Sequence, residues 1–147
     1  MHQFMLLGPV VCIVAMGCAA ENEQPAGLAK WQGNWSEVAY VHDGAKPPPE
    51  HFVDLITTFD GVNFVRRSKG KVVNQGEIRP SADGTPQRFE GTGTGPDGKE
   101  SPYTGIYSLN GDRLVMCFDP TGKTRPEKFE SPSGSGFILI TLERSKD

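Results

Sequence analysis

Two histidines and two carboxylates that flank a run of prolines could bind a metal ion. His42 and Asp43 precede three consecutive prolines, and Glu50 and His51 follow them. Imidazole nitrogens and carboxylate oxygens are common ligands of divalent metals. Their spacing matches neither the repeat of a helix nor that of a strand, so we expect the solvated side chains of a loop. The sequence therefore predicts no metal site. Because there are so few histidines, it also offers no axial ligand for haem. We therefore expect no cofactor.

Three other places in the sequence have residues typical of phosphate binding or catalysis. Gly93–Gly98 matches G-x-G-x-x-G and continues into Lys99, but Glu100 stands where a phosphate-binding loop needs Ser or Thr. Ser133–Ser135 has the composition of a turn, not of a nucleophile placed between a strand and a helix. Cys117 alternates with apolar neighbours and has no base nearby in sequence, so we expect a small buried side chain. No catalytic set emerges, and the sequence does not predict an enzyme.

Length and charge narrow the class of protein. The chain has 147 residues, enough for one domain. It carries 15 Lys and Arg against 18 Asp and Glu, a formal charge of −3, and has no basic cluster. Nucleic acid is therefore not an expected partner, because its binding needs grouped cations. With 18 Gly and 12 Pro the chain is rich in turns.

The first residues have the composition of an export signal. No charged residue occurs from Phe4 to Ala20, and this apolar stretch ends in small residues. It is short for a membrane-spanning helix, which needs about 20 apolar residues. A polar tether with Pro and Gly follows it. We predict a signal segment at 1–17, a tether at 18–27 and a folded domain at 28–147.

The end of the signal segment resembles the lipobox of bacterial lipoproteins. Its residues are Ala15-Met-Gly-Cys18. The resemblance implies that Cys18 is linked to diacylglycerol and becomes the mature N-terminus, which would anchor the domain to a membrane. The expected location is then the bacterial cell envelope, on the periplasmic or the outer surface. The alternative is an ordinary signal cleaved near Gly17 or Ala20.

The remaining chain has the pattern of an all-β protein. Short apolar runs alternate with Gly, Pro, Asn and Asp clusters about every ten residues. Consecutive hairpins favour an up-and-down antiparallel barrel of about eight strands, because closing the sheet removes its exposed edges. One helical turn is expected at Glu50–Asp54. The candidate strands are Asn34–Val41, Leu55–Phe59, Val62–Arg66, Lys71–Ile78, Gln87–Gly91, Tyr103–Leu109, Arg113–Phe118, Glu127–Glu130 and Phe137–Arg144.

Local sequence also predicts turns and side-chain faces. Asp60-Gly61 and Asn110-Gly111 are expected to be the central pairs of type I′ hairpin turns, and Ser68–Gly70 another reversal. In the first strand, simple alternation places Trp35, Ala39 and Val41 on one face. Val38 and Tyr40 would then lie on the other face.

Both ends of the folded domain resemble the calycin, or lipocalin-like, barrels. Gly33-x-Trp35 opens the first strand and Arg144 ends the last. The resemblance implies that Arg144 covers Trp35 at the barrel floor. In a closed up-and-down sheet the first and last strands pair, so the two residues would come together in a structural cation–π contact.

The chain is more closely similar to a family of small exported lipocalin-like domains of unknown function that is common in planctomycete bacteria. The resemblance covers residues 28–146. It rests on Leu28–Trp35, Gly105–Phe118, Gly122–Phe129, the Ser-Gly-Ser-Gly run ending at Gly136, and Arg144. It implies a fold and export, but assigns no activity to any residue.

Aromatic side chains on the predicted strands leave two functions open. They either fill the barrel or line a cavity for one small apolar ligand. The alternative is a ligand-free structural or protein-interaction barrel, whose loops at Ala45–Glu50 and Gly91–Lys99 would meet a partner. The candidate lining residues are Tyr40, Phe59, Phe64, Phe89, Tyr107 and Phe118.

Overall fold

A computed structural model describes residues 27–81 and 83–145. The predicted signal segment at 1–17, Cys18, and all but the last residue of the tether at 18–27 lie outside the described residues. The folded region begins with a short 3₁₀ helix, η2 (Leu28–Trp31).

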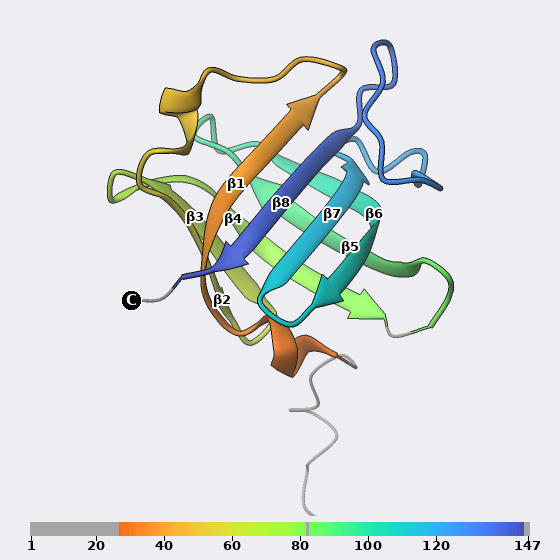
Figure 1. The fold of residues 1–147 in the computed structure, drawn as a ribbon, viewed down its shortest axis with the longest axis horizontal. Coiled ribbons are helices and arrows are strands. Elements are labelled where there is room, and N and C mark those ends of the chain that lie inside the picture. The colour runs from red at the N-terminus through yellow and green to blue at the C-terminus, as the bar shows by residue number, and fades with distance from the viewer. Residues whose placement is uncertain (1–26, 82, 146–147) are drawn as a thin grey trace, which may run out of the picture.

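The described residues form a closed antiparallel barrel in which each strand pairs with the next one along the chain and β8 returns to β1 (Figure 1). The all-β prediction of an up-and-down barrel of about eight strands is confirmed. The expected helical turn lies slightly earlier, as the 3₁₀ helix η3 (Pro49–Phe52). The strands are β1 (Gly33–His42), β2 (Leu55–Asp60), β3 (Asn63–Ser68), β4 (Lys71–Ser81), β5 (Gln87–Thr94), β6 (Glu100–Asn110), β7 (Arg113–Asp119) and β8 (Ile138–Arg144).

The barrel has one closed end and one end covered by longer connections. At the closed end, η2 lies beneath the strands (Figure 1), and its Leu28 and Trp31 are fully buried. The Trp31 ring packs edge-on against Phe59 and Tyr107, with centroids 5.4 and 4.8 Å away. We call this end the floor. The opposite end, the mouth, carries η3 and the long connection between β7 and β8 (Figure 1).

Two of the three predicted hairpin turns are displaced by one residue. Asp60 pairs with Asn63 and Asn110 pairs with Arg113, so both Asp60 and Asn110 belong to strands. The turns therefore begin at Gly61 (φ 62°) and at Gly111, which also has a positive φ. Glycine at the first central position is typical of type II′ geometry and not of the expected type I′ pair.

A tertiary contact helps to hold the first of these turns. The Gln32 side chain accepts from the Gly61 amide at 2.7 Å and donates to the Gly61 carbonyl at 3.1 Å.

The turn between β3 and β4 has the geometry that its sequence predicts. Lys69 and Gly70 both have positive φ, 51° and 83°. Both central positions of a type I′ turn require this, so the reversal expected at Ser68–Gly70 is confirmed.

The predicted strand at Glu127–Glu130 is wrong. This segment belongs to the β7–β8 connection at 120–137 and has no strand partner. Because β7 already pairs with β6 on one edge and β8 on the other, the closed barrel offers no free edge for an additional strand. Pro126 and Pro132, which lie on either side of the segment, also have no backbone N–H to donate to a neighbouring strand.

A β-bulge changes the side-chain faces of β1. The register with β8 shifts between Glu37 and Ala39. Trp35 and Glu37 are buried, whereas the adjacent Val38 and Ala39 are both exposed. The prediction that Trp35 and Ala39 share a face is therefore wrong, because the extra residue of a bulge reverses the alternation beyond it.

Among the described residues, no helix is both long and apolar enough to span a bilayer.

Candidate ligand cavity

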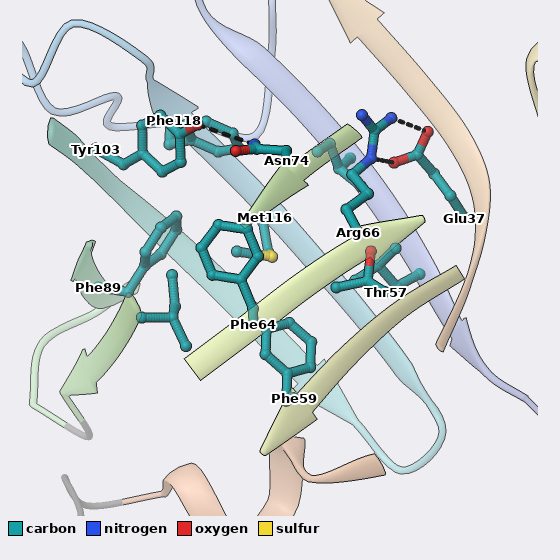
Figure 2. A pocket seen from close by; sticks show the side chains of 13 residues that line it. Glu37, Thr57, Phe59, Phe64, Arg66, Asn74, Phe89, Tyr103, Met116 and Phe118 are labelled. Atoms are coloured by element: carbon teal, nitrogen blue, oxygen red, sulfur yellow. Dashed lines mark hydrogen bonds and ion pairs between the residues drawn. The ribbon is translucent and has the colours of Figure 1, made fainter. Parts of the chain in front are cut away.

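A cavity of about 50 Å³ lies inside the barrel. Its wall is mostly apolar and includes four of the aromatic residues singled out in the sequence, Phe59, Phe64, Phe89 and Phe118 (Figure 2). An engineered cavity of about 150 Å³ accepts benzene, so about a third of that volume holds two or three non-hydrogen atoms. The aromatic rings therefore fill most of the barrel and leave a small space.

The two tyrosines among the candidate lining residues lie outside the cavity wall. Tyr107 contributes to the floor, where its ring packs on Trp31 and its hydroxyl donates to the Ser81 carbonyl at 3.1 Å. Burial raises the pKa of Tyr107 above its ordinary value. Its hydrogen bond and burial assign Tyr107 a packing role in the described structure.

Tyr40 lies beside the cavity at the mouth. Its ring centroid is 5.8 Å from the Arg66 guanidinium carbon and 5.2 Å from the His51 ring centroid. Burial raises the pKa of Tyr40, Arg66 lowers it, and Glu37 and Tyr103 raise it further. Tyr40 thus belongs to a polar cluster at the edge of the cavity.

The floor is covered by Arg144. Its guanidinium carbon lies 4.3 Å from the centroid of the Trp35 ring. Its Nη1 and Nη2 donate to the carbonyls of Gln32 and Lys30, at 2.7 and 2.9 Å, and its Nε donates to Asp112 Oδ1 at 3.0 Å. The Trp35 indole N–H donates to the Trp31 carbonyl at 2.7 Å. Gly33 precedes this contact and has a positive φ of 106°. These contacts join both ends of the described chain and are structural.

A buried carboxylate that the sequence reading missed lies on the mouth side of the cavity. The Glu37 side chain is only 1% exposed. Arg66 donates to both of its oxygens, from Nε at 3.2 Å and from Nη2 at 3.0 Å (Figure 2). His51 Nε2 lies 3.1 Å from Glu37 Oε2. The sequence does contain a signal for this burial. Glu37 follows Trp35 by two residues in a predicted strand, and alternation places both side chains on the same, buried face.

A second polar pair lies across the mouth side of the cavity. Asn74 Nδ2 donates to the Tyr103 hydroxyl at 3.1 Å (Figure 2). The Tyr103 ring packs against Phe118, with centroids 4.9 Å apart. Asn74 Oδ1 is buried and has no hydrogen-bond partner among the described residues. Tyr103 was recognised as a strand aromatic, whereas nothing in the local sequence distinguished Asn74.

The four candidate metal ligands around the prolines do not meet in one site, because each has different surroundings. His51 pairs with Glu37, Asp43 Oδ1 accepts from the Gly136 amide at 2.8 Å, and His42 forms a backbone bridge with Ala45. Glu50 is exposed. In residues 27–81 and 83–145, no three His, Cys, Asp or Glu side chains are grouped as metal ligands.

The other segments with possible chemistry have structural surroundings. The segment Gly93–Gly98 runs from the end of β5 into a loop that leads to β6, so it precedes a strand and not a helix N-terminus. Cys117 is buried, its thiol donates to the Glu130 carbonyl at 3.3 Å, and burial raises its pKa. A protonated, inaccessible thiol is a poor nucleophile.

The architecture is that of an eight-stranded up-and-down barrel and is consistent with a lipocalin-like fold. Comparisons with protein-family models, with curated proteins and with solved structures found no match. The cavity and its mouth are therefore the features from which a function is proposed.

Proposed function

We propose that this protein is an exported, lipid-anchored envelope protein whose lipocalin-like barrel binds a small, largely apolar molecule. The observation that carries the binding proposal is the cavity beside a buried acceptor, Asn74 Oδ1, that has no partner among the described residues. Buried polar atoms are usually hydrogen-bonded, so an unpaired one that borders an apolar cavity favours a ligand there.

The volume limits what the ligand can be. About 50 Å³ accommodates two or three non-hydrogen atoms. Trp31 and Trp35 are fully buried at the floor, so entry is expected from the mouth. We infer that the ligand is very small, or that it inserts a short apolar end while the remainder stays at the mouth.

Native mass spectrometry of the full chain tests ligand binding. A small molecule that copurifies with the wild type should be lost from Ile140→Phe, because Ile140 lines the cavity. Val65→Phe is the matched control. Val65 lies between the lining residues Phe64 and Arg66 in β3 and points to the other face of the sheet, so the variant adds the same ring outside the cavity. Equal retention by both variants would place the molecule outside the cavity.

The ligand-free interaction barrel is the second candidate, and the small size of the cavity favours it. Under this alternative, the wild type carries no copurifying molecule, and substitutions in the loops at 45–50 and 91–99 reduce binding of a protein partner. The mass of the wild type under native conditions therefore separates the two functions.

Metabolic labelling with a palmitate analogue tests the anchor. The wild type and Cys117→Ala should incorporate the label, and Cys18→Ala should not. Cys117 is the matched control because its thiol is buried. Absence of label from the wild type, or equal incorporation into Cys18→Ala, would contradict lipidation at Cys18.

A further inference from the structure

We propose that Asn74 and Tyr103 form a recognition pair for a neutral head group that carries both a hydrogen-bond donor and an acceptor, such as a primary amide or a hydroxyl. This inference rests on the proposed ligand-binding function and names the ligand chemistry of the same cavity. Both residues line that cavity, on β4 and β6, and neither was expected to act with the other.

The pair is built so that its polar ends meet at the cavity. Asn74 and Tyr103 are three residues past the starts of their strands, both of which begin at the mouth. Figure 2 shows their side chains approaching each other beside Phe118, above the deeper phenyl rings. On the wall behind them, Gly93 leaves room for the Tyr103 ring, because a Cβ there would collide with the ring and its hydroxyl.

The hydrogen-bonding capacity of the pair is incomplete. Asn74 Nδ2 donates to the Tyr103 oxygen at 3.1 Å, which leaves Asn74 Oδ1 as an acceptor and the Tyr103 O–H as a donor. If the amide is turned over, Tyr103 donates to the amide oxygen and the pair still offers one donor and one acceptor. The complementary ligand group therefore also carries one of each.

The charges around the cavity favour a neutral head group. Glu37 is buried, and Arg66 donates to both of its oxygens. His51 lies against the same carboxylate. An anionic head would face Glu37 without a free cation, and a cationic head would find Glu37 already paired, so either charge would be desolvated without compensation. An amide or a hydroxyl carries no such cost.

A purely structural role explains the pair less well. An apolar couple such as Leu and Phe would fill the same positions without a buried acceptor that has no partner. The remainder of the cavity wall near Tyr103 is apolar, including Phe89, Met116 and Phe118. Retaining an unsatisfied oxygen in these surroundings is expected where a ligand completes its hydrogen bonds.

Three planar molecules of equal size test the proposal with the full chain. Each has four non-hydrogen atoms, more than the cavity holds, so a methyl group would enter it while the remainder lies on the mouth side beside Asn74 and Tyr103. Acetamide offers a donor and an acceptor, acetone an acceptor only, and isobutene neither. Their binding is measured by NMR shift titration to the wild type, Tyr103→Phe and Asn74→Leu. Tyr107→Phe is the matched control, because it also removes one hydroxyl, but one that bonds Ser81 away from the cavity.

We expect Tyr103→Phe and Asn74→Leu each to weaken acetamide binding by about tenfold, since one hydrogen bond is worth about a factor of ten. Isobutene should change by less than about twofold, and Tyr107→Phe should change neither. If the wild type binds isobutene but neither variant weakens acetamide more than isobutene, the recognition pair is refuted and the ligand cavity stands. If the wild type binds none of the three, the proposed binding function is refuted as well. Having two variants keeps the test valid if one does not fold.

Discussion

Replacing the Arg144 guanidinium with an apolar group should destabilise the barrel floor. In Arg144→Met, the guanidinium over Trp35 is lost, together with its hydrogen bonds to the carbonyls of Gln32 and Lys30. The methionine retains part of the packing over the ring. The loss is therefore mainly that of the charged group and its fixed geometry.

The magnitude follows from those contacts. A partly exposed cation–π contact contributes about 0.5–1 kcal/mol. Hydrogen bonds from a charged group contribute about 1.5–3 kcal/mol each when buried, and we reduce this to about 1 because the Arg144 side chain is 34% exposed. The pair with Asp112, whose side chain is 83% exposed, adds less than about 0.5 kcal/mol. We expect Arg144→Met to reduce the free energy of unfolding by about 2–4 kcal/mol.

Urea unfolding followed by circular dichroism measures this change without relying on the fluorescence of Trp35. Arg113→Met is the matched control: its guanidinium lies 3.8 Å from Glu143, and both side chains are more than half exposed. We expect it to lose less than about 0.5 kcal/mol. If Arg144→Met loses no more than Arg113→Met, Arg144 does not stabilise the floor, and the reasoning is refuted.

Three other outcomes are expected from the same structure. Trp35→Ala should reduce the free energy of unfolding by about 3–5 kcal/mol, because the ring is fully buried; a loss below about 1 kcal/mol in urea would contradict a packed floor. Asp119→Asn should cost about 1–2 kcal/mol at neutral pH, since the carboxylate accepts from the hydroxyl and amide of Thr121 and from two further amides. Burial raises the pKa of Asp119, but the hydrogen bonds together lower it by more, so the net pKa lies below its ordinary value of 3.8. Its stabilisation is therefore present above pH 3.8 and is lost as the pH falls through the folded-state pKa, so the wild type and Asp119→Asn should converge in urea melts at low pH. Cys117 should resist iodoacetamide at pH 8 in the folded protein and react in urea, as followed by intact mass; rapid alkylation of the folded chain would contradict its burial.

The strands and their order were largely predictable because they depend on local pattern. Alternating apolar runs separated by turn residues predicted consecutive hairpins, and consecutive hairpins predicted a closed barrel. The Glu127–Glu130 segment has a similar pattern but lacks an edge to pair with. Local pattern identifies a segment able to form a strand, but a partner edge is needed to make it one.

The contents of the barrel were less predictable. Four of the six aromatic residues singled out from the sequence line the cavity, but Tyr40 and Tyr107 pack beside it and below it. The bulge in β1 explains why simple alternation placed Tyr40 on the face opposite Trp35, since the bulge shifts the faces of all residues that follow it.

The sequence by itself determined an all-β chain whose first and last strands meet, because strand period and hairpin order are local properties. Only the tertiary structure brought Glu37 to Arg66 and Asn74 to Tyr103, each pair separated by 29 residues along the chain. These meetings depend on strand register, which shifts once between β1 and β8 and once between β3 and β4, and a shift of a single residue would turn the side chains to the opposite face of the sheet. Register is decided by packing across the whole barrel, and so is the chemistry of its cavity.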